Sequence, residues 1–127
     1  MATKWTIGGD ANDPQRLAEF WAAALGYILE PGYDYPDGGS IVDPDGVGPA
    51  IGFLRVPEPK TSKNRLHIDI RVAGSDEHDA AAVERMRAKA AELVKLGAVQ
   101  VREEFWAPGV LANVIMLDPE GNEFCVG

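Results

Sequence analysis

Two short segments in the second half of the chain carry side chains that could do chemistry together. In the segment RLHIDIRV, polar and apolar residues alternate, so an extended strand places His67, Asp69 and Arg71 on one face. The other face, which we expect to pack on a helix in the core, carries Leu66, Ile68, Ile70 and Val72. In NEFCV, the same alternation places Glu123 and Cys125 on one face and Phe124 and Val126 on the other, which we expect to face the core. A histidine beside a carboxylate can act as a general acid and base, and a histidine, a carboxylate and a thiolate can together bind zinc. We therefore expect these five side chains to face one concave surface.

Each of these residues also has a plainer interpretation. His67 is either a catalyst or a hydrogen-bonded structural residue, and Asp69 either orients His67 or forms an ion pair with a nearby arginine. Cys125 is either a metal ligand or a small buried residue beside Phe and Val. Arg55, in the segment AIGFLRV of the first half, and Arg71 either bind an acidic group of a ligand or are ordinary surface charges.

Aromatic residues in two loop regions are candidates for covering a pocket. Tyr33 and Tyr35 lie in the turn-rich segment GYDYPDGG, and Trp106 lies in EEFWAPG. The alternative for all three is an exposed loop tip. His78 lies among acidic residues at the start of an expected helix, and we predict that it is solvated. No phosphate-binding loop, dinucleotide fingerprint, nucleophile elbow or paired-cysteine motif is present in the sequence.

The first half of the chain predicts one helix among short strands. Asp13 can cap the helix, Pro14 suits its first position, and Gly26 suits its left-handed end. Apolar residues at helical spacing, Leu17 and Phe20 among them, form its inner face. The expected strands are residues 4–9, 27–31, 40–42 and 50–56.

The second half predicts the same order of elements. A strand at 65–72 precedes a long helix that runs from about Asp76 to Leu96, and Gly97 follows it. The residues expected on the inner face of this helix are Val83, Met86, Ala90, Leu93 and Val94. The expected strands that follow are residues 98–105, 112–117 and 122–126.

The matching helix ends and turns of the two halves indicate an internal duplication. Leu-Gly ends both helices, and the turn DPDG in the first half matches DPEG in the second. Each half is then a βαβββ module, at about residues 3–57 and 65–127, joined by the polar connector 58–64. We predict an α+β fold with one domain, 1–127, in which the open faces of two curved mixed sheets enclose a cleft.

Composition limits the classes of partner. The chain has 127 residues, a net charge of −8 and one cysteine, and its sequence pI is about 4.6. The acidic balance argues against binding nucleic acid or an anionic membrane, because both require a basic surface. The sequence shows no apolar run typical of a signal peptide or membrane helix, so we expect a cytoplasmic protein.

Four segments taken together resemble a known superfamily. RLAEFWAAALGY, KNRLHIDIRV, LGA and DPEGNEFCV are similar to the vicinal oxygen chelate superfamily. That superfamily includes glyoxalase I, bleomycin-resistance proteins, fosfomycin-resistance enzymes and extradiol dioxygenases. The resemblance is closest to its small glyoxalase-like branch and covers nearly the whole chain. It implies the same paired βαβββ fold.

The resemblance implies an incomplete metal site. In metal enzymes of this superfamily, the first and last strands of each half supply one ligand each, usually His, Glu or Gln. His67 takes one of these places, and Cys125 takes another that is normally Glu. The opening strand of the first half has no such residue, and Arg55 is the charged residue of its closing strand. A divalent metal is therefore expected only if Cys125, with Asp69, supplements His67.

The resemblance leaves two functions open. One is a glyoxalase-like enzyme of the lyase, isomerase or dioxygenase kind, which acts on a small organic molecule in the cleft without the usual four-ligand metal site. There His67 is the expected acid or base, and glyoxalase I activity itself is expected to be absent. The other is a metal-free protein of the bleomycin-resistance type, which sequesters a drug or metabolite. The resemblance also implies a homodimer.

Overall fold

The computed structural model describes residues 1–75 and 77–127 and divides the chain into two compact units. The first unit is Met1–Pro59 and the second is Lys60–Gly127. Each unit has one helix and one four-stranded sheet. This confirms the α+β fold of two βαβββ modules. That the units form a single domain and enclose a cleft stays a prediction.

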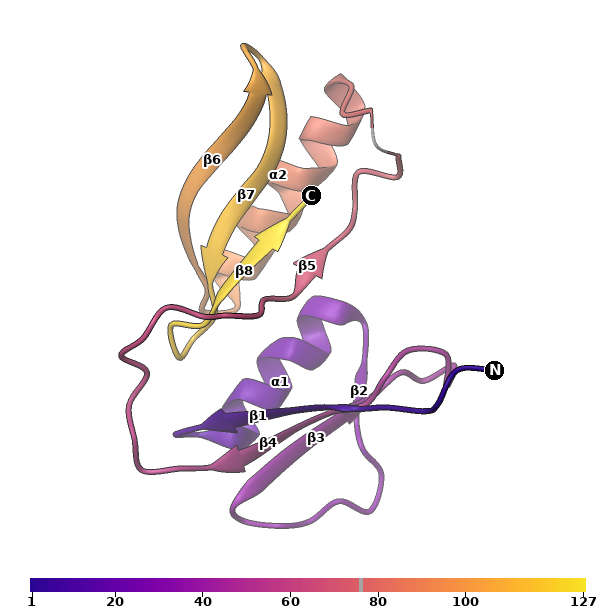
Figure 1. Ribbon diagram of the computed structural model, residues 1–127, viewed down its shortest axis with the longest axis vertical. Coiled ribbons are helices and arrows are strands. Elements are labelled where there is room, and N and C mark those ends of the chain that lie inside the picture. Colours follow the sequence, from indigo (N-terminus) through magenta and orange to yellow (C-terminus); the bar gives the residue numbers. More distant parts are fainter. Residues whose placement is uncertain (76) are drawn as a thin grey trace. The chain divides into compact units, whose positions relative to one another are not determined.

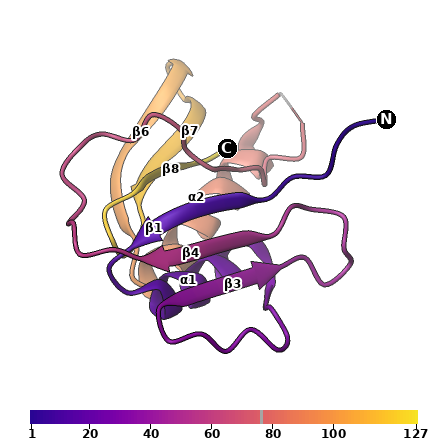
Figure 2. The ribbon, with the colours of Figure 1, turned by 60° about the horizontal axis from the view of Figure 1, so that its bottom comes forward.

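The first unit is a mixed sheet with a helix on one face (Figure 2). Its sheet order is β1-β4-β3-β2, with β1 parallel to β4 and the other pairs antiparallel. The elements in chain order are β1 (Ile7–Ala11), α1 (Pro14–Leu25), β2 (Ile28–Leu29), β3 (Gly38–Val42) and β4 (Ile51–Arg55).

Helix α1 begins and ends as its sequence predicts. The side chain of Asp13 accepts a hydrogen bond from the backbone N–H of Arg16 at 3.2 Å, and Pro14 is the first helical residue. Gly26 ends the helix at a φ of 70°, in the left-handed region that favours glycine. Leu17 and Phe20 are buried on the face that packs on the sheet. The predicted helix is confirmed.

The second unit repeats this topology. Its sheet order is β5-β8-β7-β6, with β5 parallel to β8 and the remaining pairs antiparallel, and α2 lies against the sheet (Figure 1). The elements are β5 (Asp69–Ile70), α2 (Ala80–Lys95), β6 (Val99–Ala107), β7 (Val110–Leu117) and β8 (Glu123–Val126). The first strand of each unit therefore pairs in parallel with the last, as a duplicated module requires.

Helix α2 starts later than expected. Asp76, the expected start, lies outside the described residues, and the helix begins at Ala80 after Asp79 caps it through a 2.9 Å bond. Its core residues are Ala82, Met86, Ala90 and Leu93. Placing Val94 on the inner face was wrong, because its side chain is 46% exposed on the last turn. Across residues 1–75 and 77–127, neither helix is long and apolar enough to cross a membrane.

The segment RLHIDIRV forms a shorter strand than its alternation predicts. Only Asp69–Ile70 is a regular strand, although the N–H of Cys125 also donates to the carbonyl of Ile68 at 3.1 Å. Leu66 is 88% exposed, so its assignment to the core was wrong. The polar connector ends just before Leu66, and regular pairing with β8 begins only at Asp69, so Leu66 lies outside the paired part of the strand. The side chain of Ile70 is buried as expected.

The two DPxG turns have the same local structure. In each, the glycine N–H donates to the aspartate carbonyl at 2.9 Å. The carboxylate of Asp43 accepts backbone N–H bonds of 2.8–3.2 Å from Asp45, Val47 and Gly48. The carboxylate of Asp118 accepts backbone N–H bonds of 2.9 Å from Glu120 and Asn122. Such side-chain bonds fix a turn locally, which supports the inferred duplication.

Candidate functional site

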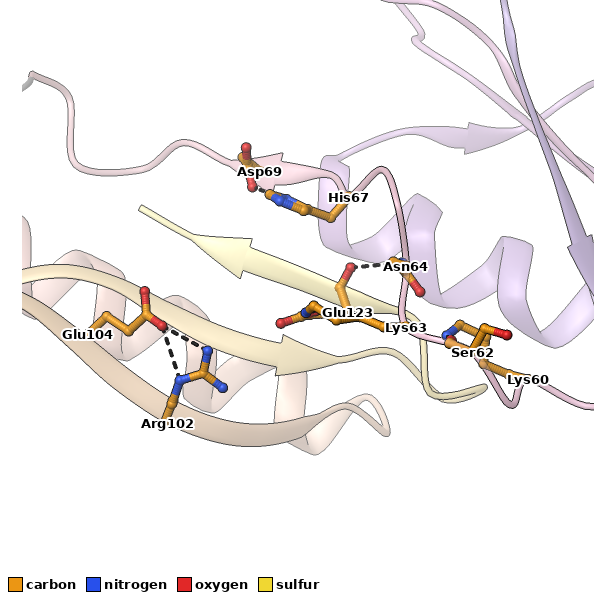
Figure 3. Close-up of polar contacts among 9 residues, drawn as sticks. All are labelled: Lys60, Ser62, Lys63, Asn64, His67, Asp69, Arg102, Glu104 and Glu123. Carbon is orange, nitrogen blue, oxygen red and sulfur yellow. Dashed lines mark hydrogen bonds and ion pairs between the residues drawn. The ribbon is translucent and has the colours of Figure 1, made fainter.

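A histidine–carboxylate pair lies on the face of the second sheet that is turned away from α2. His67 Nδ1 lies 2.7 Å from Asp69 Oδ1, and the two side chains point toward each other beside β8 (Figure 3). Because a carboxylate accepts hydrogen bonds, the ring donates from Nδ1, and Nε2 of the neutral ring is left as a base. The side chains of His67 and Asp69 are 45% and 51% exposed, so a ligand can reach them. Of the alternatives for Asp69, the structure shows the contact with His67.

Strand pairing brings the only cysteine of the chain to this pair. Asp69 is the direct partner of Cys125 in the parallel β5–β8 ladder. Ligand atoms of His67, Asp69 and Cys125 all lie within 4.8 Å of one another. The thiol also forms a hydrogen bond with Asp69. Asp69 therefore connects the imidazole and the thiol, which the sequence predicted only as residues of a shared face.

The surroundings keep the Cys125 thiol protonated. Burial is the largest cause that raises its pKa, and the charge of Asp69 is the next. The hydrogen bond that the thiol donates to Asp69 and the charges of Glu123 and Glu104 act in the same direction, and the pKa is raised to about 11. A nucleophilic cysteine requires the opposite shift, because the thiolate is the reactive form. Cys125 is thus half-buried and not activated as a nucleophile in this structure.

These side chains line a pocket of about 390 Å³ that is formed within the second unit. It contains four of the predicted site residues, and five further residues complete it. The lining residues are His67, Asp69, Arg71, His78, Trp106, Ala112, Asn113, Cys125 and Gly127. A pocket with a few convergent polar groups and one aromatic wall is typical of a small-molecule site.

Glu123 shares the sheet face but does not line this pocket. Its carboxylate pairs with Lys63, and its backbone carbonyl accepts a bond from Asn64 Nδ2 at 3.2 Å (Figure 3). The bond from Lys63 is the largest cause that lowers the pKa of Glu123, and the charges of Lys63 and Arg102 act in the same direction. In this structure Glu123 anchors the segment that carries His67.

Arg55 lies in the first unit, at the end of β4. Its guanidinium donates to the carbonyl of Asn12 at 2.7 Å and pairs with Asp37 at 3.3 Å. These bonds occupy the group within its own unit. That Arg55 faces a ligand together with Arg71, which lines the second unit's pocket, stays a prediction.

The sequence interpretation missed His78. Solvation was predicted for it, but Nδ1 donates to the carbonyl of Leu111 at 2.7 Å and the ring packs on Trp106 with centroids 4.6 Å apart. Both rings line the pocket. The acidic neighbours of His78 suggested an exposed helix start, and no local pattern indicates that β7, more than thirty residues later, covers it.

The types of donor group in the pocket suit a small metal site. One imidazole, one carboxylate and one thiol converge, and three such ligands with an open position are typical of catalytic zinc. A dication would reverse the local electrostatics, because a coordinating thiol loses its proton. His67, Asp69 and Cys125 therefore fit a three-ligand site and not the usual four-ligand one.

Comparison with solved structures defines the class of fold. A glyoxalase/bleomycin resistance protein/dioxygenase family enzyme from Burkholderia phytofirmans matches with a TM-score of 0.70 and 15% identity, over 95% of this chain and 94% of that one. The fosfomycin resistance protein FosX from Listeria monocytogenes, as a mutant complexed with Mn(II) and 1S,2S-dihydroxypropylphosphonic acid, gives 0.69 and 12%, over 99% and 90%. A hypothetical protein of S. aureus gives 0.67 and 15%, over 99% and 93%.

The sequence itself identifies the family. Residues 6–127 match the family model described as the glyoxalase-like domain. The chain therefore belongs to the glyoxalase-like domain family of the vicinal oxygen chelate superfamily. No curated protein matches it.

Proposed function

We propose that this protein binds a small organic molecule in the second unit's pocket and moves a proton on it with His67. The observation that carries the proposal is the 2.7 Å bond between His67 Nδ1 and Asp69 within that pocket. Asp69 holds the ring in one tautomer, so Nε2 is the basic atom that meets the ligand. A proton transfer next to a carbonyl, as in an isomerase or lyase, is the reaction class that this pair serves best.

The proposed chemistry needs no nucleophile from the protein. The Cys125 thiol, with its pKa raised to about 11, stays protonated and adds no negative charge to the pocket. Arg71 lines the same pocket and can stabilise negative charge there. His67 then takes a proton from carbon and can return it to a neighbouring position.

The test is proton exchange at carbon in deuterated water. A panel of enolisable aldehydes and ketones is incubated with wild-type protein, with His67→Gln and with Lys89→Ala, a helix substitution outside the pocket. Deuterium incorporation by wild type and Lys89→Ala, reduced about 100-fold or more in His67→Gln, is expected. Equal exchange by wild type and His67→Gln would contradict a role for His67 as base.

A sequestering protein is the second candidate. The stacked rings of His78 and Trp106 form an aromatic wall in the pocket, which suits retention of a planar drug or metabolite without chemistry. Tight binding combined with no exchange at any carbon of the bound molecule would favour this function over the first.

A bound dication would change the mechanism in one way. His67, Asp69 and Cys125 are the residues that would hold it, and it would supply Lewis-acid stabilisation of a ligand oxygen. Binding must displace the thiol proton, so affinity should rise with pH. Calorimetric titration with Zn²⁺ at pH 6.5 and 8 should show this rise in wild type and lose it in Cys125→Ser.

The assembly we propose is a symmetric homodimer. Two edge strands leave large apolar side chains exposed: Ile28 and Leu29 on β2, and Val99 and Val101 on β6. Exposed edge strands and apolar patches are surfaces that proteins commonly cover by association. Sedimentation at micromolar concentration should give twice the 13.7 kDa chain mass, and a monomer alone would contradict the dimer.

A further inference from the structure

One part of the pocket is built from residues that the proton-transfer proposal does not use. His78 precedes α2, Trp106 lies on β6, and Asn113 lies on β7. The rings of His78 and Trp106 are 4.6 Å apart at 33°, a tilted stack. Trp106 nevertheless remains 62% exposed, so most of its surface is open to a ligand. Three separate segments thus supply two stacked rings, those of His78 and Trp106, together with the polar atoms of His78 and Asn113.

The hydrogen bond of His78 determines what its other nitrogen can do. Nδ1 lies 2.7 Å from the carbonyl oxygen of Leu111, which can only accept, so Nδ1 carries the proton. In the neutral ring, Nε2 is then an acceptor. Nε2 is buried and has no hydrogen-bond partner among residues 1–75 and 77–127. A buried acceptor without a donor is costly, so it marks a place where a donor is expected.

Asn113 presents a second acceptor of the same kind. Its amide Oδ1 is buried and has no partner in the described part of the chain, and its side chain lines the same pocket. The strand register places it opposite Glu104 on β6. It lies two residues before Ile115, the partner of Cys125, and so on the same face of the sheet. Asn113 and His78 therefore both offer acceptors, on the pocket that Cys125 and Asp69 also line.

We infer that the pocket takes a ligand with a planar nitrogenous group that carries at least two N–H donors, such as an amidine or an aminoheterocycle. The flat group lies against Trp106 and donates to His78 Nε2 and Asn113 Oδ1. This inference rests on the proposed function, because it names the ligand class of the same pocket. A ligand with an acidic group in that position would place acceptors against acceptors.

The charges beside Cys125 agree with this class. Asp69 and Arg71 are the formally charged residues of the lining, and Glu104 faces the same sheet surface in a pair with Arg102 at 2.8 Å (Figure 3). The carboxylates Asp69, Glu123 and Glu104 each disfavour a negative charge at Cys125. The field at that thiol is therefore one that a cation or a neutral donor tolerates better than an anion does.

Two probes of the same shape test the ligand class. Benzamidine carries a planar N–H-donating cation, and benzoate carries a planar anion of similar size without donors. Each is titrated to millimolar concentration into ¹⁵N-labelled protein. The indole N–H of Trp106 and the side-chain amide of Asn113 are followed. Benzamidine should shift both resonances and bind about tenfold more tightly than benzoate.

Variants separate the two acceptors from general loss of folding. Asn113→Leu removes one acceptor with little change in volume, and His78→Phe keeps a ring beside Trp106. Each should weaken benzamidine binding about fivefold or more, while Gln100→Ala, an exposed residue of β6, should leave it unchanged. Dispersed amide spectra show which variants remain folded, and Asn113→Leu suffices if His78→Phe does not.

Three results would overturn the inference. Benzoate that binds as well as benzamidine would show that the ligand class is wrong, although the pocket would remain a binding site. Shifts by neither probe would contradict a donor-seeking pocket, and unchanged affinity of a folded Asn113→Leu would show that its acceptor is not used. None of these depends on carbon exchange by His67, so failure of that chemistry is seen separately.

Discussion

The two units share a topology and a turn but differ on the sheet face that carries the candidate site in the second unit. In the second unit, the parallel first and last strands place Asp69 beside Cys125. In the first unit, the corresponding strands place Gly8 beside Gly52 and Asp10 beside Leu54. Residues 1–59 contain no histidine or cysteine, so Asp10 on this face has neither of the partners that Asp69 has in the second unit. The duplicated fold is thus a scaffold, and the proposed chemistry depends on a few residues placed on one copy.

The largest difference in stability is expected between substitutions on the two faces of the second sheet. Phe124 is 1% exposed in the core, and Phe124→Ala should lower the free energy of unfolding by about 3–5 kcal/mol. His67→Ala, on the other face, should cost less than about 1 kcal/mol because its side chain is 45% exposed. Urea denaturation of both variants measures this. Equal destabilisation would make His67 a structural residue.

Two isoleucines of the same segment, Ile68 and Ile70, provide a second comparison of stability. Ile68 was expected to be a core residue, but it is half-buried, whereas Ile70 is 7% exposed. Ile70→Ala should therefore destabilise the protein more than Ile68→Ala does, within the range of about 2–5 kcal/mol for buried isoleucine. The reverse order would show that the strand register is shifted.

The next effect concerns the reactivity of the single cysteine. With its pKa raised to about 11, Cys125 should react with iodoacetamide at pH 8 roughly 100-fold more slowly than the same chain unfolded in urea. Asp69→Asn should accelerate the reaction, because it removes the charge that disfavours the thiolate. Mass spectrometry follows the single adduct. Alkylation of the folded protein at the unfolded rate would contradict the buried, carboxylate-flanked site.

The duplicated turns should differ in strength. Asp118 is 3% exposed, and Asp118→Ala leaves two partly buried N–H groups without their acceptor, at a cost of about 1.5–3 kcal/mol. Asp43 is more exposed, so Asp43→Ala should destabilise the protein less. Thermal unfolding of the two variants measures the difference. A larger loss of stability for Asp43→Ala would mean that the first turn contributes more to the stability of the fold than the second does.

The turn of the first unit also predicts a pH dependence. Backbone N–H bonds from Gly48 and Asp45 lower the pKa of Asp43 below its ordinary value. A carboxyl group with a lowered folded-state pKa stabilises the protein above its unfolded pKa and loses that effect as pH falls through the folded value. Wild type should therefore lose stability below about pH 4 more steeply than Asp43→Asn. If the stability of the two proteins falls in parallel as pH decreases, Asp43 does not contribute to the pH dependence of stability.

The smallest effect is expected on the open face of the first unit. Gly8→Ala adds a methyl group where nothing lies within 4 Å, so stability should change by less than about 1 kcal/mol and in the favourable direction. Gly39→Ala is the contrast, because its Cβ would clash with the carbonyl oxygen of Pro14. Calorimetric melts compare them. Strong destabilisation by Gly8→Ala would mean that this face is covered.

Local patterns predicted the scaffold better than the site. Asp13, Pro14 and Gly26 define α1 because capping acts within one turn, and the alternation of NEFCV correctly placed Phe124 inside and Cys125 outside. His78 could not be placed this way, since its partners Leu111 and Trp106 come from distant strands.

The extent of the His67 strand was also overestimated. Alternation alone predicted eight residues, but strand pairing depends on the partner, and β8 is short. Enough pairing remains to keep Asp69 beside Cys125. The contact between His67 and Asp69 was foreseen as one of two alternatives, and deciding between them required the side-chain geometry.

The most direct test of the His67–Asp69 pair is the tautomer of the His67 ring. A two-bond ¹H–¹⁵N correlation spectrum of the chelator-treated protein at neutral to mildly alkaline pH reports which ring nitrogen carries the proton. The 2.7 Å bond to Asp69 predicts a proton on Nδ1 and a free lone pair on Nε2, with this preference reduced in Asp69→Asn. A ring protonated on Nε2 in wild type, unchanged in Asp69→Asn, would contradict the pair as the basic centre of the site.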